Sequence, residues 1–339
     1  MRTLFHPAFL HPPTGDPGVW IDIPDEGRAV LVDIPSIAHV PARKLLRLAH
    51  AVVTHTHMDH FIGFDHLLRA ALRHDGPLAV TGPAGFLESV RGRVGAYAWN
   101  LIGAYPVRLR IQEVADGTLR AEEYTGASRM RPVALQETPF HGTIHAERAF
   151  RVEVATFDHG IPVLGVVVRE ARRIAVNKDA LARRGLIPGA WLKDVKDALR
   201  RGDHRDTLLE TQRADGTRAA RPLGELADEL VVEGPGQVVA YLTDLAGTRE
   251  NLDRAEAFVR GADILLCEAA FLDADRELAA ERKHLTAMQA GELARRAGAK
   301  RLNVFHVSPR YEGRETEIFR EAAEAYGAPS TRNDGGGPL

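Results

Sequence analysis

The stretch Thr54-His-Thr-His-Met-Asp-His60 places three imidazoles and one carboxylate within six residues. It follows an apolar run over residues 49–53, typical of a buried strand, and precedes a helical pattern over residues 66–72. A loop at the end of a strand can turn several side chains toward one point. Imidazole nitrogens with a carboxylate are the ligands that zinc prefers when sulfur is absent. The alternative is a polar turn that is histidine-rich by chance, but such clusters usually mark metal or catalytic sites.

Length and composition indicate a globular protein without a dominant charge. At 339 residues the chain could form one large domain or two ordinary ones. Its apolar content of 45% and charged content of 27% are typical of soluble globular proteins. The net charge of −2 supplies no overall attraction to nucleic acid, so a nucleic-acid binder would need a local basic patch.

The remaining global features favour a reducing compartment. The single cysteine, Cys267, excludes an intrachain disulfide bond. Prolines and a histidine interrupt residues 1–10, so they do not resemble a signal peptide, and no stretch approaches the roughly 20 apolar residues of a membrane span. We expect a cytoplasmic protein with no membrane segment.

The order of apolar runs predicts an α/β protein. The runs over 49–53 and 77–85 are each followed by a helical pattern, the second over residues 86–94. Residues 105–157 contain several strand-like runs without a long helical period, which predicts a meander and hence a mixed sheet. A helix is expected over residues 284–296.

Further candidate ligands follow other apolar runs, where α/β proteins build sites because rigid strands end at one edge of the sheet. Taken alone, a histidine at such a place is more often an ordinary loop residue, but an incomplete metal cluster favours a ligand. Glu268 also ends a run. The candidate metal ligands are His55, His57, Asp59, His60, His159, Asp244 and His306. These seven exceed the needs of one four-coordinate zinc and suit two ions that share a bridging carboxylate.

Asp33 and the segment 170–222 each allow two interpretations from the residues alone. Asp33 ends the apolar run 29–33 and could be a turn or helix-capping residue, or a partner that orients a metal-bound histidine. The segment 170–222 is net basic and contains the apolar stretch 185–193. It could be a solvated insertion with a small hydrophobic cluster, which charge alone favours, or a basic arm that grips a polyanion through phosphate contacts.

Four motifs together resemble a known family. His55-Thr-His-Met-Asp-His60 resembles the His-x-His-x-Asp-His signature of metallo-β-lactamase-fold hydrolases. Three further segments are similar to motifs of one branch, the ribonuclease Z (tRNA 3′-processing endonuclease) family: Asp158–Pro162, Lys283–Ala287 and Phe305–Tyr311. The resemblance runs in order from about Val30 to Tyr326.

The resemblance implies a fold and a domain organisation. The fold would be an αββα sandwich, in which two mixed β-sheets pack face to face with helices outside. Residues 1–328 would form a single hydrolase domain, with 170–222 as an inserted basic arm and 329–339 as a disordered tail.

The resemblance also implies roles for individual residues. One zinc would be held by His55, His57 and His159, and the other by Asp59, His60 and His306, with Asp244 as the bridge. Asp59, His284 and Glu268 would be catalytic, His284 as the general acid and Glu268 as the carboxylate that orients or tunes it. Asp33 matches an early carboxylate of the family pattern, which favours its orienting role. Substrate contacts are expected from Lys193, Arg310, Lys178 and Arg184.

The implied activity is removal of the 3′ trailer from precursor tRNA by a hydroxide that two Zn²⁺ ions activate, with Mn²⁺ or Fe as alternative metals. The family also implies a homodimer. Two departures concern the substrate: Ile34–His39 replaces a Cys-Gly-Glu-Gly-Thr-Gln run, and Cys267-Glu-Ala-Ala270 replaces His-Glu-Ala-Thr. A hydrolase of small phosphodiesters, or of another ester or lactone, and a non-catalytic RNA-binding module therefore remain as alternatives.

Overall fold

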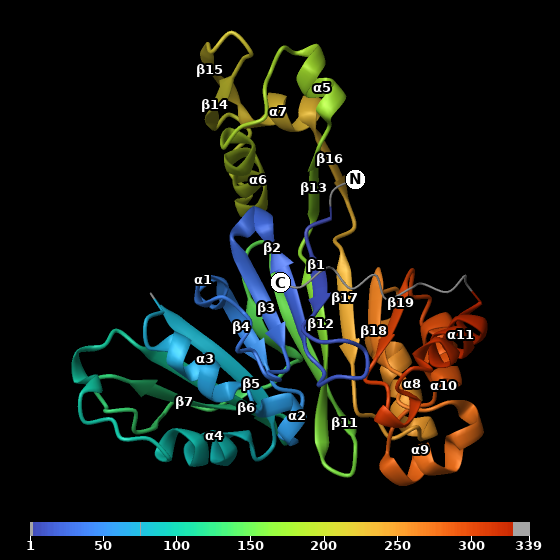
Figure 1. Ribbon diagram of the computed structural model, residues 1–339. Helices are drawn as coiled ribbons and strands as arrows, with labels where there is room; N and C mark the ends of the chain where they lie inside the picture. The colour runs from blue at the N-terminus through green and yellow to red at the C-terminus, as the bar shows by residue number, and fades with distance from the viewer. Residues whose placement is uncertain (1–2, 75, 328–339) are drawn as a thin grey trace. The chain divides into compact units, whose positions relative to one another are not determined.

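The computed structural model describes residues 3–74 and 76–327 of the chain (Figure 1). The protein divides into two compact units. The larger, here called the core unit, comprises Phe5–His145, Val152–Val168 and the chain from Val238 on. The smaller, here called the arm unit, comprises Ala146–Arg151 and Arg169–Gln237, with the first described residues through Leu4. The predicted tail 329–339 lies outside the described residues.

The first sheet of the core unit is mixed, as the sequence predicts. Strands β3 to β6 run parallel to one another, whereas the pairs β1–β2, β2–β3, β6–β7, β7–β8 and β7–β9 are antiparallel. The strands are β1 (His6–Phe9), β2 (Val19–Ile23), β3 (Arg28–Val32), β4 (Leu48–Val52), β5 (Pro77–Pro83), β6 (Arg108–Ala115), β7 (Thr118–Thr125), β8 (Val133–Ala134) and β9 (Thr138–Pro139).

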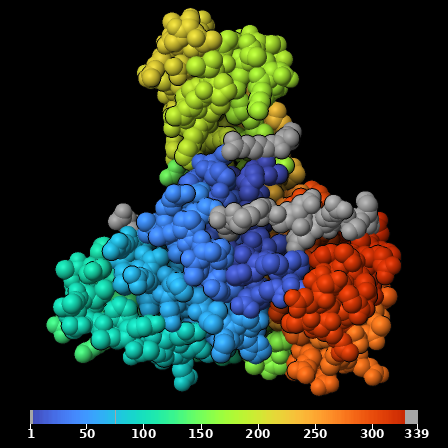
Figure 2. Space-filling model, in the orientation of Figure 1, coloured from blue at the N-terminus to red at the C-terminus, as the bar shows by residue number. Residues whose placement is uncertain are grey.

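Helices cover one face of this sheet. The helices are α1 (Ala42–Leu45), α2 (Met58–Phe61), α3 (Phe64–Ala71) and α4 (Phe86–Gly95). Buried residues of successive strands, such as Leu31, Ala51 and Ile111, share one hydrophobic core with Leu67 of α3 and Val90 of α4. In Figure 2 the teal part of the core unit, which includes α4, lies at its surface.

The second sheet has its own helical layer. Its strands in spatial order are β10 (Thr143–Ala146), β11 (Phe150–Asp158), β12 (Pro162–Glu170), β17 (Val238–Leu242), β18 (Ile264–Glu268) and β19 (Leu302–Phe305), of which the last three are parallel. Its helices are α8 (Arg249–Val259), α9 (Arg276–Arg282), α10 (Ala287–Arg296) and α11 (Glu315–Tyr326). Ala240, Leu265 and Val304 of the strands share a core with Leu293 of α10 and Ile318 of α11.

Contacts between the two sheets complete the sandwich. The Phe9 ring of the first sheet lies 5.1 Å from the Phe305 ring of the second, which also stacks on Tyr241 at 4.9 Å. The outer faces carry α3 and α4 on one side and α8, α10 and α11 on the other (Figure 1). The predicted αββα sandwich is therefore confirmed.

The arm unit has a hydrophobic core of its own. Its elements are β13 (Arg173–Val176), α5 (Lys178–Arg183), α6 (Trp191–Arg201), β14 (Leu208–Gln212), β15 (Arg218–Pro222), α7 (Leu223–Leu230) and β16 (Val231–Gly234). Strands β13 and β16 form an antiparallel ribbon, and β14 and β15 form a second antiparallel pair. Trp191, Val195, Leu226 and Leu230 are buried together, and the Trp191 indole N–H donates to the Ile187 carbonyl at 3.0 Å.

One helix begins later than the sequence predicts. The helix expected over residues 284–296 begins at Ala287, because Thr286 is its N-cap and forms a capping box with Gln289. The preceding helix, α9, has Lys283 as its C-cap residue, whose φ of 60° is left-handed. His284 therefore lies in a connection between two helices. No helix among the described residues is long and apolar enough to cross a membrane.

Candidate metal centre

Three candidate site residues share an unusual backbone conformation at strand ends. Asp33 follows β3, Asp244 lies two residues beyond β17, and His306 follows β19, with φ values of 59°, 52° and 56°. Non-glycine residues rarely adopt this left-handed region, at a cost of about 1–3 kcal/mol each. Because such a residue turns the chain sharply out of its strand, the conformation sets the direction of each side chain. Strain of this kind clusters at functional sites.

The structure brings His55, His57 and His159 together. One donor atom from each lies within 4.8 Å of the others, and the His55 and His57 rings are 4.4 Å apart. Nδ1 of His159 lies 2.8 Å from the Lys283 carbonyl oxygen, which can only accept, so His159 donates there and its Nε2 is left as an acceptor. The left-handed turn at Lys283 thus fixes the orientation of a candidate ligand that lies 124 residues earlier in the chain.

Asp59, His60 and His306 form a second group. Oδ2 of Asp59 lies 3.4 Å from His60 Nε2 and 3.5 Å from His306 Nε2. The two histidines hold the pKa of Asp59 well below its usual range, although partial burial acts in the opposite direction. The group therefore offers one ionised carboxylate and two imidazoles.

Asp244 lies between the two groups. Its Oδ2 is 2.7 Å from His60 Nε2 and 3.8 Å from His55 Nε2, while its Oδ1 is 3.2 Å from His306 Nδ1. Burial raises the pKa of Asp244, but His306 and His60 outweigh it and hold the carboxylate ionised. A carboxylate in this position contacts members of both groups, as a bridging ligand must.

Asp33 orients His60 through a buried hydrogen-bond network. Its Oδ2 lies 2.9 Å from His60 Nδ1 and accepts the Tyr241 hydroxyl at 3.0 Å, while Oδ1 accepts the Thr54 backbone N–H at 2.7 Å. Burial lowers the pKa of His60, but the charges of Asp33 and Asp244 outweigh it and raise that pKa well above its usual value. Thr54 and Tyr241 were not among the predicted site residues. Thr54 opens the histidine motif and so carried a signal, whereas nothing in an apolar strand distinguishes Tyr241.

The hydrogen bonding of the buried imidazole nitrogens indicates whether a metal ion fits between these residues. Among the described residues, Nε2 of His55 has no hydrogen-bond partner, although it is buried, and the Asp244 carboxylate oxygen lies 3.8 Å away. Leaving such atoms unpaired is unfavourable, and a bound cation would satisfy them. Burial, together with the neighbouring His60, lowers the pKa of His55 to about 2, so its nitrogen lone pair is not protonated. A donor set of imidazole and carboxylate suits Zn²⁺, Mn²⁺ or Fe. The residues therefore fit a metal cofactor.

Glu268 and His284 form a pair at the edge of the cluster. Oε2 of Glu268 lies 2.7 Å from His284 Nδ1, and Oε1 accepts the Leu245 backbone N–H at 2.6 Å. Because both oxygens are occupied, Glu268 is less suited to bind a metal than the seven candidate ligands, although it lies within reach of Asp244 and His306. Burial lowers the pKa of His284, but Glu268 and Asp244 outweigh it and raise that pKa to about 10.

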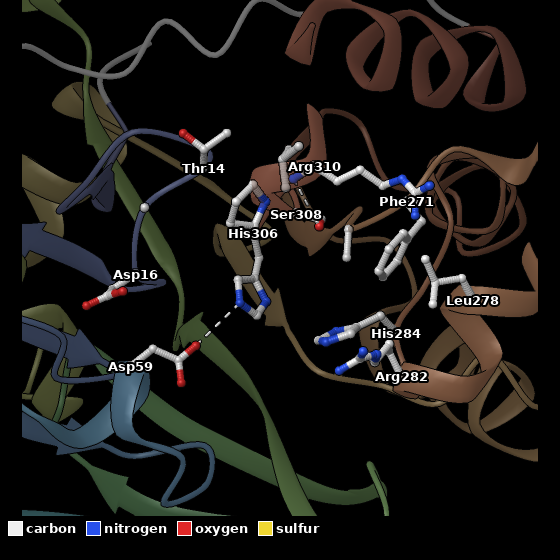
Figure 3. A pocket seen from close by; sticks show the side chains of 14 residues that line it. Thr14, Asp16, Asp59, Phe271, Leu278, Arg282, His284, His306, Ser308 and Arg310 are labelled. Atoms are coloured by element: carbon white, nitrogen blue, oxygen red, sulfur yellow. Dashed lines mark hydrogen bonds and ion pairs between the residues drawn. The ribbon is translucent and has the colours of Figure 1, made fainter. Parts of the chain in front are cut away.

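A cavity of about 440 Å³ opens beside the cluster. Figure 3 shows Thr14, Asp16 and Asp59 on one side of it and Phe271, Leu278, Arg282 and His284 on the other, with His306, Ser308 and Arg310 between them. The predicted substrate residue Arg310 thus lines this cavity.

Arg282 is a cavity residue that the sequence reasoning missed. Its side chain is exposed and forms no ion pair within the part of the chain that the structure describes. The available signal was its position two residues before His284. An unpaired guanidinium beside the candidate metal ligands gives this wall of the cavity an affinity for anions.

The other three predicted substrate residues lie in the arm unit and are exposed. Arg184 pairs with Glu229, and Lys193 Nζ lies 3.4 Å from Asp197 Oδ2, whereas Lys178 forms no ion pair within residues 3–74 and 76–327. Residues 170–222 carry thirteen Lys and Arg against eight Asp and Glu. Residues 223–237 add four acidic residues and no basic one, so the arm unit is less basic than the segment 170–222 alone.

Comparisons with known proteins give consistent results. A family model described as a beta-lactamase superfamily domain matches residues 198–307. The chain is 32% identical over 326 residues to a protein of Deinococcus radiodurans named Ribonuclease Z, covering 94% of each chain. It is 32% identical over 312 residues to the Ribonuclease Z of Thermobifida fusca, covering 86% of this chain and 82% of the other. The crystal structure of human tRNase Z, short form, superposes with a TM-score of 0.52 at 18% identity, covering 90% and 92% of the two chains.

Proposed function

The chain belongs to the ribonuclease Z family of metallo-β-lactamase-fold hydrolases, and we propose that it is a metal-dependent endoribonuclease that removes the 3′ trailer from precursor tRNA. The observation that carries the proposal is the position of the His284–Glu268 pair beside the seven-ligand cluster, on a cavity that also contains two arginines. A metal-dependent phosphodiester hydrolase can use all three features: a metal site, a proton donor and cations for phosphate.

In this proposal the cofactor is a pair of Zn²⁺ ions, with Mn²⁺ or Fe as alternatives. His55, His57 and His159 would hold one ion, Asp59, His60 and His306 would hold the other, and Asp244 would serve both. Bound there, the ions supply Lewis-acid stabilisation of phosphate charge and lower the pKa of a water molecule. The donor atoms of these residues lie close enough together for such a site.

His284 is the proton donor to the departing oxygen. An imidazolium carries a proton on each nitrogen, and Nδ1–H of His284 is directed to Glu268. The Nε2–H then remains for the substrate, because His284 lines the cavity. The raised pKa keeps this proton in place at neutral pH. Glu268 acts through His284 as its orienting partner.

The cavity wall around His284 positions the substrate. Arg282 and Arg310 provide two guanidinium groups, which bind phosphate oxygens well. Phe271 and Leu278 supply an apolar surface beside His284 for a base or ribose (Figure 3). On the opposite side of the cavity lie the proposed metal ligand Asp59 and Asp16. The Asp16 carboxylate repels phosphate, so the RNA backbone follows the arginine side of the cavity.

Several finer points of the proposal rest on the family. Lys178, Arg184 and Lys193 contact the RNA outside the core unit, the protein is a homodimer, and it is cytoplasmic. Sedimentation of the purified protein measures whether it is a homodimer, and cell fractionation measures whether it is cytoplasmic.

The decisive experiment is cleavage of a 3′-extended precursor tRNA by metal-loaded protein, with bis-p-nitrophenyl phosphate as a small phosphodiester control. We expect a single cut at the end of the mature tRNA sequence, and no cut by the Asp59→Ala or His284→Ala protein. Turnover of the small ester with intact precursor tRNA would contradict the RNA substrate while keeping the hydrolytic site. Cleavage by the Asp59→Ala protein at the wild-type rate would contradict the site.

A further inference from the structure

A second cavity of about 450 Å³ lies in the core unit, outside the candidate metal centre. One wall comes from the end of α4 and the chain that follows it, and the other from the turn between β7 and β8. This part of the unit is teal to green in Figures 1 and 2. None of the candidate metal ligands lines it. The residues that do are Arg91, Val94, Gly95, Tyr97, Trp99, Asn100, Tyr124, Arg129, Met130, Arg131 and Pro132.

The charges around this cavity select an anion. Three arginines line it, and no carboxylate does among the described residues. Arg91 is already neutralised, because its Nε lies 3.1 and 3.2 Å from the two carboxylate oxygens of buried Glu122. Arg129 and Arg131 are exposed and form no ion pair within residues 3–74 and 76–327. Two guanidinium charges therefore remain for a ligand, in a protein whose net charge is negative.

Aromatic side chains stand beside these charges. The Tyr97 and Trp99 rings lie edge to face, with centroids 6.0 Å apart. The Trp99 indole N–H donates to the Val94 carbonyl at 2.9 Å, which fixes the plane of the ring. The exposed amide of Asn100 follows on the same loop. Aromatic rings next to unpaired guanidinium groups suit a ligand that joins a flat base to a phosphate.

The wall formed by the turn between β7 and β8 is held rigidly. Arg129 and Met130 have positive φ values of 53° and 57°, and the Met130 side chain is buried in the core. Hydrogen bonds between Ser128 and Thr125 close this turn, with Ser128 N–H donating to Thr125 Oγ1 at 3.0 Å and Ser128 Oγ–H to the Thr125 carbonyl at 3.2 Å. A strained turn held in this way loses little entropy when a ligand binds.

At Gly126 the turn packs closely against the backbone of the opposite wall. A Cβ atom at Gly126 would lie 2.5 Å from the Tyr105 carbonyl oxygen and 2.7 Å from that of Ile102. Only glycine permits this close approach of the turn to the loop that continues from Trp99. The cavity is therefore largely formed before a ligand arrives.

We propose that this cavity binds one nucleotide of single-stranded RNA, with the base against Tyr97 and Trp99 and the phosphates against Arg129 and Arg131. The choice of RNA over a free nucleotide rests on the proposed function, whereas the preference for a base joined to phosphate rests on the cavity alone. Its volume falls within the roughly 300–1,000 Å³ of small-ligand sites. It would give the core unit an RNA contact separate from the metal centre.

Trp99 provides a local reporter for the test. The protein has three tryptophans, of which Trp20 and Trp191 are buried and Trp99 is partly exposed. Binding of an unstructured RNA hexanucleotide to the metal-free protein is followed by tryptophan fluorescence over a series of salt concentrations. We expect quenching in the wild type and its loss in Trp99→Phe. The double variant Arg129→Ala/Arg131→Ala should bind at least about tenfold more weakly, with the slope of log K against log salt smaller by about 1.4.

A matched control removes the same charge elsewhere. Arg295 and Arg320 are exposed on α10 and α11, and Arg295→Ala/Arg320→Ala should keep wild-type affinity and slope. Equal loss in both double variants, or quenching that survives in Trp99→Phe, would overturn the proposal. So would free adenosine monophosphate binding as tightly as the hexanucleotide. Shielding of Trp99 that rises with protein concentration in the absence of RNA would instead identify a second copy of the chain as the occupant. Because metal-free protein is used, failure to cut precursor tRNA would contradict the proposed function and not this site.

Discussion

Glu268 Oε2 lies 2.7 Å from His284 Nδ1, although the two residues come from the end of β18 and the connection before α10. The other Glu268 oxygen accepts the Leu245 backbone N–H, so the carboxylate cannot rotate away from the imidazole. Glu268 is fully buried, and its charge is therefore screened weakly by water. The Nδ1 atom of His284 consequently faces two carboxylates, Glu268 and, at 3.1 Å, Asp244 Oδ1, and its other nitrogen faces the cavity.

Replacing Glu268 by Gln should lower the pKa of His284 and weaken the proton donor. The pKa of about 10 depends on Glu268 and Asp244, and Gln removes one of these charges while keeping the shape. An acid works only while protonated, so the wild-type rate is lost as pH rises through the pKa of His284. In Glu268→Gln this loss should begin at lower pH, with a rate about 10- to 100-fold below wild type near pH 8. The kcat–pH profile of precursor-tRNA cleavage measures it.

The exposed Glu277, in the first turn of α9, gives the control for that experiment. Glu277→Gln removes the same charge and should leave the pH profile where it is. If the high-pH limb of Glu268→Gln coincided with that of the wild type, Glu268 would not be the partner that sets the proton affinity of His284.

The positions of the candidate metal ligands could be predicted from the sequence, because each follows an apolar run that forms a strand. The residues that orient these ligands through hydrogen bonds could not be predicted. Tyr241 reaches Asp33 across 208 residues of chain, and only the packing of the two sheets brings them together. The apolar pattern includes Leu285 and predicts a helix from residue 284, whereas the N-cap at Thr286 starts α10 three residues later. The acidic residues of α7 lie beyond the segment that the charge pattern singled out, which made the arm look more basic than it is.

Asp33→Asn should weaken metal binding without disturbing the backbone. Asn tolerates the left-handed conformation that Asp33 adopts at a φ of 59°. However, His60, Thr54 and Tyr241 all direct hydrogen atoms at the Asp33 oxygens, and an amide nitrogen cannot accept any of them. His60 then loses its fixed orientation, and we expect metal affinity to fall about 10- to 100-fold. Competition with a chelator of known affinity measures the change.

The partly exposed Asp22, which pairs with Arg47, offers the matched control for Asp33. Asp22→Asn should bind metal as the wild type does. Wild-type affinity in Asp33→Asn would show that His60 needs no carboxylate to orient it.

Metal binding should release protons near neutral pH. Asp33 and Asp244 raise the pKa of His60 well above its usual value, and Asp244 raises that of His306 to about 9, despite the burial of both rings. Both imidazoles are therefore protonated in the metal-free protein at about pH 7, whereas a metal requires the unprotonated nitrogen. Calorimetry in buffers of different ionisation enthalpy should report release of at least one proton per protein. The number should fall as pH rises through 9, because His306 is then already neutral, and a number that stays constant would contradict this assignment.

Lys178 should contribute more to RNA binding than Arg184, although both are exposed on the arm unit. Arg184 pairs with Glu229, which also lies 3.7 Å from Arg221, so an RNA phosphate must compete with a carboxylate for its guanidinium. Lys178 is exposed and has no such competitor among the described residues. We expect Lys178→Ala to raise the KM for precursor tRNA several-fold, with little change in kcat, and to reduce the salt slope of binding by about 0.9. Arg184→Ala should change both quantities less. Lys300→Ala, which removes a lysine that pairs with Asp263 in the core unit, is the charge control. A larger effect of Arg184→Ala than of Lys178→Ala would mean that RNA displaces Glu229 from its arginine, and that the ion pairs of the arm open when RNA binds.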